Sequence, residues 1–380
     1  MIPFSFDALR RYPDVEASNL FASDAADRLL LDEAADALAA SADGETVVIG
    51  DNYGALTLGA TALHASAGVR VHQDALTGER ALEANAARLA LPGGYTSHEL
   101  DASLVSGARV VLLRLPKSLS ALDEIAGIVA QHALPDVTVY AGGMLKHMSR
   151  SMNEVLAEHF DTVRPGLARQ KARVLTASGG RRASTTTEWP HREFHADLGI
   201  WVCAHGAAFA GTSIDIGTRY LLSFLDQMKP DATAAIDLGC GTGVLAATLA
   251  HARSGMRVLA TDQSAAAVAS ARATADANGV ADRITVVRDD ALAAQPDASA
   301  ELILLNPPFH LGTSVHAGAG LKLIEDAGRV LAPGGELWTV FNSHLAYQPA
   351  LRRVVGPTRQ VGRNAKFTVT VSTTGAAPGL

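Results

Sequence analysis

The sequence predicts an α/β protein in which one doubly wound fold occurs twice in tandem. Apolar, strand-like runs alternate with segments of helical periodicity through most of the 380 residues. A glycine-containing turn follows the first strand of each half, at 50–54 and 239–243, and an aspartate follows each turn about twenty residues later. Each copy is therefore expected to form a mostly parallel sheet with helices on both faces and an antiparallel hairpin at its end.

The first copy is expected to span residues 1–178, with a linker after it. Its strands are predicted at 46–49, 69–72, 109–113 and 137–140, and its helices at 25–40, 76–91 and 119–131. The small and polar stretch that follows predicts a linker over 179–195.

The second copy is expected to span residues 196–380. Its strands are predicted at 235–238, 257–261, 284–287, 302–305 and 336–341. Helices are expected near 219–228, before Asn278 and over 321–331, and the segments 354–361 and 367–371 are expected to pair as a closing hairpin.

Composition limits the class of protein. The net charge of −7 excludes an overall basic nucleic-acid binder, so local patches must meet any polyanion. The N-terminus lacks a basic segment followed by an apolar one, and no apolar run approaches the length of a membrane span, so we expect a cytoplasmic protein without a membrane partner. The only cysteines, Cys203 and Cys240, lack disulfide or metal spacing, and no metal is expected.

An unusual turn, Asn306-Pro307-Pro308-Phe309, follows the buried strand predicted at 302–305. In open α/β sheets, ligands bind at the carboxyl ends of the strands. The two prolines remove backbone donors and leave carbonyl oxygens and the Asn306 amide oxygen as acceptors. Phe309 adds a flat apolar face, so the turn suits an NH2 group carried by a planar ring.

The glycine turn of the second copy has the pattern Asp237-x-Gly239-x-Gly241-x-Gly243. Glycines between a strand and a helix let the backbone approach a nucleotide closely. The dinucleotide fingerprint would need a glycine at Val244, and no Gly-Lys-Ser/Thr of a P-loop follows. The pattern therefore predicts a nucleotide site of another kind.

Two acidic residues end the neighbouring strands. Asp262 can accept both hydroxyls of a ribose, and Asp290 can accept from an adenine amino group. Each alone is as consistent with an ordinary strand end. Their order after the glycine turn and before Asn306 favours a single nucleotide site.

The first copy departs from the second at the positions that carry this chemistry. Asn52 stands where the second copy has Gly241, and it places a side chain where a ligand would need close backbone approach. Arg114 replaces Asn306, and an arginine donates hydrogen bonds only. We therefore expect the N-terminal copy to be catalytically inactive.

Asp237 to Gly243, Asp262, Asp290 and Asn306 to Phe309, in this order, resemble the motifs of class I S-adenosylmethionine-dependent methyltransferases. With the following His310, the chain more closely resembles bacterial rRNA guanine-N2 methyltransferases, which pair a degenerate methyltransferase-like domain with an active one. Short motifs such as Pro116-Lys117 are more similar to the large-subunit (23S) than to the small-subunit (16S) enzymes. The resemblance implies S-adenosylmethionine as cofactor and rRNA as partner. It also implies that the N-terminal copy docks RNA, and Arg114 and Lys117 are then expected to contact phosphate.

The resemblance implies methyl transfer to the exocyclic N2 of a guanine, with two Rossmann-like domains. Asn306 and the Pro307 carbonyl would accept the hydrogens of the amine, and Phe309 would stack on the extruded base. His310 is expected at the edge of the substrate.

RNA is expected to meet local basic clusters. Two segments rich in cations contain no acid, one between Asp161 and Glu188 and one after Glu336. Phosphate contacts by such clusters give affinity without sequence information. The residues that we expect to contact RNA are Arg169, Lys171, Arg173, Arg363 and Lys366.

Other functions fit part of these observations. The same acceptor geometry suits adenine N6 or a glutamine amide of a protein, and a 16S rRNA enzyme would share the motifs. A non-catalytic RNA-binding assembly factor would keep the basic clusters, although the intact glycine turn disfavours it. We expect a monomer.

Overall fold

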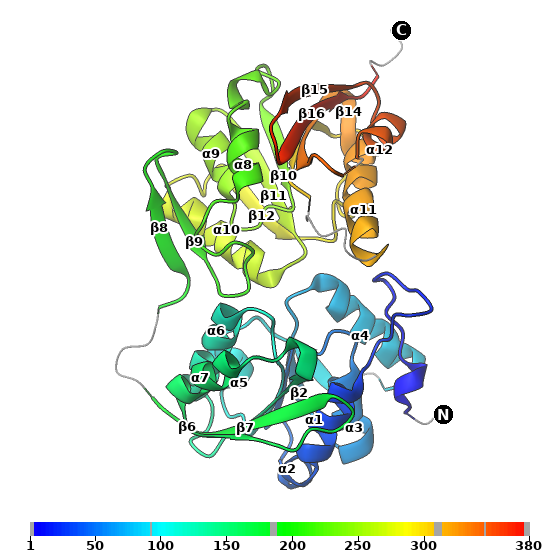
Figure 1. Cartoon of the computed structure of the whole chain (residues 1–380), viewed down its shortest axis with the longest axis vertical. Coiled ribbons are helices and arrows are strands. Elements are labelled where there is room, and N and C mark those ends of the chain that lie inside the picture. The colour runs from blue at the N-terminus through cyan, green and yellow to red at the C-terminus, as the bar shows by residue number, and fades with distance from the viewer. Residues whose placement is uncertain (1–3, 92, 183–187, 308–313, 346, 376–380) are drawn as a thin grey trace. The chain divides into compact units, whose positions relative to one another are not determined.

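The computed structural model describes residues 4–375, apart from 92, 183–187, 308–313 and 346, and omits the side chains of 314–319. The chain divides into two compact units, Met1–Trp189 and Pro190–Leu380 (Figure 1). Each unit contains one seven-stranded sheet, and the second also carries a separate two-stranded hairpin.

The N-terminal unit has the strand order β3-β2-β1-β4-β5-β7-β6. The first five strands pair in parallel, and β7 pairs antiparallel with both β5 and β6. The strands are β1 (Thr46–Ile49), β2 (Val69–His72), β3 (Tyr95–Ser97), β4 (Val110–Arg114), β5 (Thr138–Met144), β6 (Phe160–Pro165) and β7 (Ala172–Gly180). The helices are η1 (Phe6–Ala8), α1 (Ala25–Glu33), α2 (Ala35–Ala40), α3 (Ala55–His64), α4 (Leu76–Arg88), α5 (Ala102–Val105), α6 (Leu119–His132), η2 (Leu145–His147) and α7 (Arg150–His159).

The C-terminal unit repeats this order as β12-β11-β10-β13-β14-β16-β15. Its strands are β10 (Ala234–Leu238), β11 (Arg257–Asp262), β12 (Ile284–Arg288), β13 (Ala300–Leu305), β14 (Leu331–Asn342), β15 (Thr358–Arg363) and β16 (Phe367–Thr373). The helices are α8 (Ile216–Leu222), η3 (Leu225–Gln227), α9 (Val244–Ala252), α10 (Ala265–Ala277), α11 (Ser314–Val330) and α12 (Tyr347–Val354). The predicted duplication of one mostly parallel fold is confirmed.

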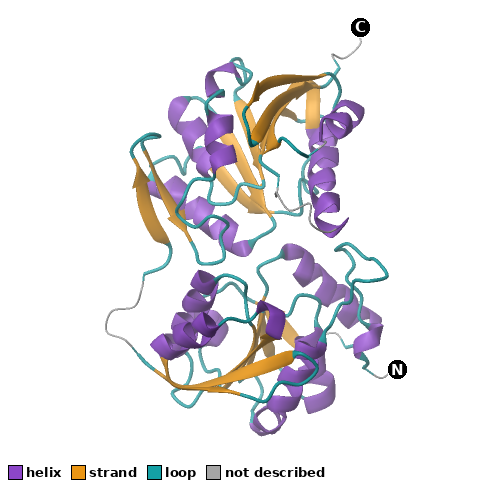
Figure 2. Ribbon diagram, in the orientation of Figure 1, coloured by secondary structure: helices purple, strands orange, loops and turns teal. Residues whose placement is uncertain are grey.

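The apolar run of β13 reflects burial on both faces of the sheet. Leu302 and Leu304 pack into the core beneath α8, α9 and α10, whereas Ile303 and Leu305 pack into the core beneath α11 and α12. Helices cover both faces of each sheet (Figure 2). A strand covered on both sides reads as a continuous hydrophobic run, which is why the sequence located it.

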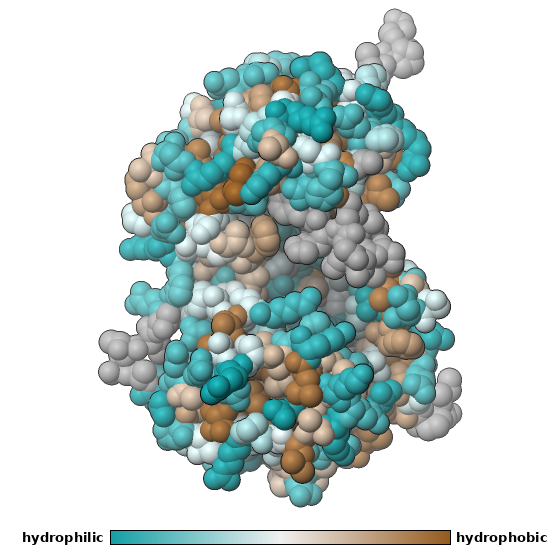
Figure 3. All heavy atoms as spheres, viewed as in Figure 1, coloured by the Kyte–Doolittle hydropathy of each residue, from teal (hydrophilic) through white to brown (hydrophobic). Residues whose placement is uncertain are grey.

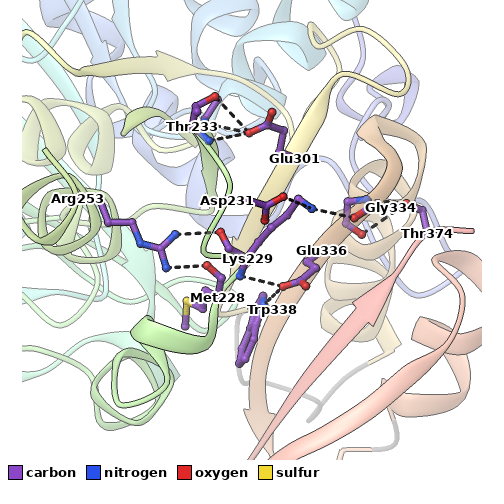
Figure 4. Close-up of polar contacts among 12 residues, drawn as sticks. Met228, Lys229, Asp231, Thr233, Arg253, Glu301, Gly334, Glu336, Trp338 and Thr374 are labelled. Atoms are coloured by element: carbon purple, nitrogen blue, oxygen red, sulfur yellow. Dashed lines mark hydrogen bonds and ion pairs between the residues drawn. The ribbon is translucent and has the colours of Figure 1, made fainter. Parts of the chain in front are cut away.

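A polar network closes the amino end of the C-terminal sheet (Figure 4). The Glu336 carboxylate accepts from the Lys229 backbone N–H at 3.1 Å and from the Trp338 indole at 2.7 Å. Glu301 accepts from the Thr233 backbone N–H at 2.8 Å. These bonds fix the loop that enters β10, so the opposite, carboxyl edge of the sheet is left for a ligand.

The secondary structure differs from the predictions in several places, and two of these bear on the predicted linker and the closing hairpin. Strand β8 (His191–His195) lies inside the predicted linker and pairs with β9 (Ile200–Ala204), and β7 extends to Gly180. The residues of β8 are largely exposed and lack an apolar pattern. The strand expected from 354 begins only at Thr358, because the preceding residues form α12, which buries Tyr347 and Leu351.

Hydrophilic residues predominate on the face drawn in Figure 3, with hydrophobic residues in small separate areas. Within the described ranges, none of the helices combines the length and apolarity needed to cross a membrane.

Candidate functional site

A cavity of about 370 Å³ opens at the carboxyl ends of β10, β11 and β13. The loop before α8 and the side of α11 complete its wall. Six of the residues predicted from the sequence line it: Gly239, Gly241, Asp262, Asp290, Asn306 and Pro307. Its place at the strand ends is the usual ligand position in an open α/β sheet.

The three glycines of the turn have different roles. All adopt positive φ, at 71° for Gly239, 53° for Gly241 and 76° for Gly243, a region that side chains disfavour. A Cβ on Gly239 or Gly241 would meet no atom within 4 Å, whereas one on Gly243 would lie 3.0 Å from Ala271. The first two glycines expose backbone at the cavity, and the third permits close packing of α9 against α10.

Asp237 lies behind the glycine turn and is completely buried. Its Oδ2 accepts from the Ala246 backbone N–H at 3.0 Å, and its Oδ1 has no partner among the described residues. Burial raises the pKa of this carboxyl group to about 7, and the nearby charge of Asp262 adds to the effect. Asp237 does not line the cavity, so its carboxyl group can act on a ligand only through the turn in front of it.

Asp262 connects the end of β11 to the glycine turn. Its Oδ2 accepts from the Gly241 backbone N–H and its Oδ1 from that of Ser264, both at 3.0 Å. A carboxylate offers about four acceptor positions, which is more than these two bonds use. The contact with Gly241 means that one carboxylate shapes the turn and faces the cavity.

Asp290 is held by a residue that the sequence analysis missed. Lys322 of α11 places its Nζ 2.5 Å from Asp290 Oδ2. Asp289 shapes the same turn, because its carboxylate accepts from the backbone N–H groups of Asp290 and Ala294. No sequence motif connects Lys322 with Asp290, which lies 32 residues earlier. Only the fold brings the two residues together.

The Asn306 amide has a fixed orientation. Its Nδ2 donates to Asp215 Oδ2 at 3.1 Å and to Thr218 Oγ1 at 2.9 Å. A carboxylate only accepts hydrogen bonds, so the NH2 group must face Asp215. The amide oxygen, Oδ1, is buried and has no hydrogen-bond partner among the residues described. The chain therefore places an unused acceptor at the wall of the cavity.

Other predicted residues are placed differently. Pro308, Phe309 and His310 lie outside the described residues. Arg363 and Lys366 are exposed on the β15–β16 hairpin.

The N-terminal basic cluster is partly engaged within the protein. Arg169 forms an ion pair with Asp32 at 3.0 Å, whereas Arg173 is partly buried and Lys171 is exposed. The C-terminal cations Arg352, Arg353, Arg359, Arg363 and Lys366 are exposed and form no ion pair within the described part of the chain.

The equivalent strand end of the N-terminal unit is filled by ion pairs. Arg114 Nη1 lies 2.8 Å from Asp24 Oδ1 and 2.9 Å from Asp27 Oδ1, and the guanidinium is mostly buried. The prediction that Arg114 contacts phosphate is therefore wrong, because its charge is already paired. Asn52 adopts φ 61°, the left-handed conformation of its counterpart Gly241, which asparagine tolerates better than most residues.

The cavity wall includes further residues that no sequence motif indicated, Phe209, Ala210 and Ser213 in the loop before α8. Thr218 and Asp215, at the start of α8, also line the cavity. Asp215 does cap α8, through the Thr218 backbone N–H at 3.1 Å, but it also orients Asn306.

The strand order, the glycine turn and the acidic strand ends define the fold of a class I S-adenosylmethionine-dependent methyltransferase, present in two copies. The family model "Methyltransferase small domain" matches residues 199–371, and "RLMG N-terminal domain" matches residues 2–181. The chain belongs to the ribosomal RNA large subunit methyltransferase G family.

Relatives named ribosomal RNA large subunit methyltransferase G cover nearly all of the chain. The protein from Streptomyces coelicolor is 35% identical over 97% of this chain and 98% of its own. Those from Streptomyces avermitilis and Pseudomonas aeruginosa PAO1 are each 33% identical, over 97% of both chains. A solved structure, the T. thermophilus 16S rRNA N2 G1207 methyltransferase (RsmC) in complex with AdoMet and guanosine, shares the fold, with a TM-score of 0.70 at 19% identity, covering 95% of this chain and 97% of that one.

Proposed function

We propose that this protein transfers the methyl group of S-adenosylmethionine to the exocyclic N2 of a guanine in large-subunit (23S) rRNA. The full-length relatives named for the large ribosomal subunit support the choice of RNA. The observation that carries the chemistry is the buried Asn306 Oδ1, an acceptor whose partner is missing. We also propose that the protein acts in the cytoplasm, on its rRNA substrate. We propose that it acts as a monomer.

The cavity fits the cofactor. Gly239 and Gly241 would allow its methionine part to approach the backbone, Asp262 would accept the ribose hydroxyls, and Asp290 would accept the adenine amino group. Asp237, which does not line the cavity, would act on the cofactor from behind the turn through the charge of its carboxyl group. When bound, S-adenosylmethionine supplies a methyl group on a sulfonium centre.

The residues of the turn would hold the target amine. The lone pair of a guanine N2 is delocalised into the ring, so the amine is a poor nucleophile. Asn306 Oδ1 and the Pro307 carbonyl would each accept one N–H and orient the nitrogen toward the methyl group, so most of the acceleration would come from alignment. Pro308 and Phe309 would complete the turn, with the ring of Phe309 stacked on the base and His310 at its edge.

The two units would divide the work. The N-terminal unit, proposed over 1–178, would dock RNA without catalysis, because ion pairs occupy its strand end at Arg114. The C-terminal unit, proposed over 196–380, would hold the cofactor. Arg363, Lys366 and the exposed Lys171 are the cations best placed to meet phosphate, whereas Arg169 would first have to leave Asp32.

Mass spectrometry of rRNA from a strain that lacks the gene would test this function. We expect one N2-methylguanosine to disappear from 23S rRNA, to return with the wild-type gene, and to stay absent with Asn306→Ala. Asn153→Ala, at a half-buried asparagine of the N-terminal unit, is the matched control and should restore the methyl group. If N6-methyladenosine disappears instead, or a methyl group of 16S rRNA, the proposed substrate is wrong and that nucleotide is the substrate.

Calorimetry with S-adenosylmethionine separates the enzyme from an RNA-binding assembly factor. The enzyme should bind S-adenosylmethionine. The Asn306→Ala variant should bind it nearly as well, because the amide that it lacks is proposed to contact the guanine and not the cofactor. An absence of binding by the wild-type protein would favour the assembly factor.

A further inference from the structure

The β8–β9 hairpin is a two-stranded sheet separate from the main sheet of its unit. The inward side chains of β9, Ile200 and Val202, are completely buried in the core. Phe194 and Trp201 are directly paired across the strands, so they share the opposite, outward face. Only β8 lies within the predicted linker, and no part of the proposed chemistry uses the hairpin.

The outward face presents two aromatic rings and a guanidinium. Phe194 is 50% exposed and Trp201 is 37% exposed. Their ring centroids lie 5.3 Å apart at an interplanar angle of 52°, and the Arg192 guanidinium lies 5.3 Å from the Trp201 ring centroid. Arg192 forms no ion pair with any described residue. Adjacent exposed rings beside an unpaired cation differ from the isolated apolar residues that most surfaces carry.

The outer edge of β9 is held by a helix instead of a further strand. Three side chains of α10 and its C-terminal end, spaced four residues apart, accept hydrogen bonds from the backbone N–H groups of alternate residues in β9 and just after it. Four helical residues rise about 6 Å, and two strand residues rise about 6.6 Å, so the two spacings match over this length. The bonds run from Trp201 N to Asn278 Oδ1 at 2.8 Å, from Cys203 N to Thr274 Oγ1 at 2.9 Å, and from His205 N to Ser270 Oγ at 2.9 Å.

These bonds fix Trp201 in particular. Asn278 accepts from its backbone N–H and donates to its backbone oxygen at 2.7 Å, so both polar groups of that peptide edge are engaged. An aromatic residue on a fixed backbone loses little further entropy when a partner stacks on it. The chain continues from β9 directly into the loop that lines the cavity with Phe209.

We propose that Arg192, Phe194 and Trp201 form a stacking platform for an unpaired nucleotide of the RNA substrate. Every base offers a flat π face, and proteins bind unpaired bases by stacking them on aromatic rings and guanidinium planes. The positive charge of Arg192 also suits the phosphates beside such a base. This inference rests on the proposed function, because it takes the RNA from it.

Fluorescence anisotropy with labelled oligoadenylate and oligouridylate tests the platform on the full chain. Adenine stacks more strongly than uracil, so the wild-type protein should bind oligoadenylate more tightly. The double variant Phe194→Ala/Trp201→Ala should bind oligoadenylate about 5- to 150-fold more weakly and lose this preference, since a stacked base contributes about 1–3 kcal/mol. Trp201→Phe, which keeps an aromatic ring, should retain most of the affinity. Phe21→Ala, at a phenylalanine 74% exposed in the other unit, should change nothing.

The dependence on salt distinguishes stacking from phosphate contact. Removing the rings should lower affinity equally at all salt concentrations, because the slope of log K against log[salt] counts phosphate contacts. Unchanged affinity in the double variant, or a reduced salt slope with the adenylate preference intact, would overturn the platform. A protein that changes from dimer to monomer in the double variant, with RNA binding unaltered, would show that a second copy occupies this face.

The same preparations keep this inference separable from the proposed function. If the variants methylate rRNA and bind both probes like the wild type, the platform is wrong and the function stands. If the wild type fails to methylate rRNA while the ring variants still lose oligoadenylate binding, the platform stands and the substrate is wrong.

Discussion

One oxygen atom of Asp215 joins the start of α8 to Asn306. Asp215 Oδ2 accepts from the Thr218 backbone N–H and from Asn306 Nδ2, both at 3.1 Å. The helix cap and the orientation of the amide therefore depend on the same carboxylate. This contact turns Asn306 Oδ1 into a preorganised acceptor, which matters where catalysis depends on alignment.

Removing this carboxylate should slow methyl transfer more than it weakens substrate binding. In Asp215→Ala the Asn306 amide keeps only Thr218 and can rotate, so we expect kcat to fall about ten- to a hundredfold, the value of a hydrogen bond to a charged group. Loss of the helix cap should also destabilise the protein by about 1 kcal/mol. Steady-state kinetics provide the measurement, with KM for each substrate as the comparison.

Thr218→Val is the matched variant, because it removes only the neutral partner of the same amide and keeps the shape of the side chain. It should reduce kcat less than Asp215→Ala. If Asp215→Ala raises only the KM for S-adenosylmethionine and leaves kcat unchanged, Asp215 acts in cofactor binding instead.

The Asp237 carboxyl group should make the ligand-free protein less stable as pH rises. Its pKa is about 7 in the folded protein, against 3.8 for an unperturbed aspartate, so the unfolded chain ionises first. The stability that the protonated carboxyl group contributes is fully present below pH 3.8, decreases as the pH rises to about 7, and is absent above that. At 1.36 kcal/mol per pKa unit, the total loss is about 4 kcal/mol. Urea unfolding at about pH 5 and about pH 8 measures the part of this loss that falls between pH 5 and 7, about 3 kcal/mol.

Asp237→Asn should abolish that part of the pH dependence and make the ligand-free protein more stable than the wild type at about pH 8. It should also weaken binding of S-adenosylmethionine, because it removes the negative charge behind the turn. Asp231→Asn, at an exposed position, is the control and should leave both properties unchanged. An identical pH profile in Asp237→Asn would contradict the assignment.

The glycine turn provides a pair of substitutions that separate folding from binding. Gly243→Ala forces a Cβ to 3.0 Å from Ala271, so it should destabilise the protein by about 1–3 kcal/mol through overpacking, in addition to backbone strain. Gly241→Ala meets no neighbour and should cost only about 1–2 kcal/mol of strain, but its methyl group should obstruct the cofactor. Thermal unfolding should show the larger loss of stability in Gly243→Ala, whereas calorimetry should show the larger loss of cofactor affinity in Gly241→Ala.

The sequence predicted the parts of the fold that local chemistry determines. Leu302 to Leu305 form a continuous apolar run because both faces of β13 are covered. The turn around Gly241 was recognisable because positive φ angles require glycine or a residue such as Asn52. These features depend on a few neighbouring residues, so they can be detected without a structure.

Contacts between distant residues could not be predicted in the same way. Asp215 and Asn306 are 91 residues apart, and neither belongs to a motif that names the other. The exposed strand β8 carries no apolar alternation, since its packing energy comes from β9. Arg114 was misassigned because a cation at a strand end looks the same in sequence whether it faces solvent or pairs with Asp24.

The basic residues should differ in their contribution to RNA binding according to whether they are already paired. Arg359 and Arg363 are exposed and form no ion pair within the described ranges, whereas Arg169 contacts Asp32 at 3.0 Å. Each phosphate contact adds about 0.7–0.9 to the slope of log K against log[salt]. Arg359→Ala and Arg363→Ala should therefore each lower the slope for an rRNA fragment by about that amount. Arg169→Ala should leave the slope nearly unchanged, because the charge that it removes is already paired with Asp32. A larger effect of Arg169→Ala than of the two C-terminal variants would place the main phosphate contacts on the N-terminal unit.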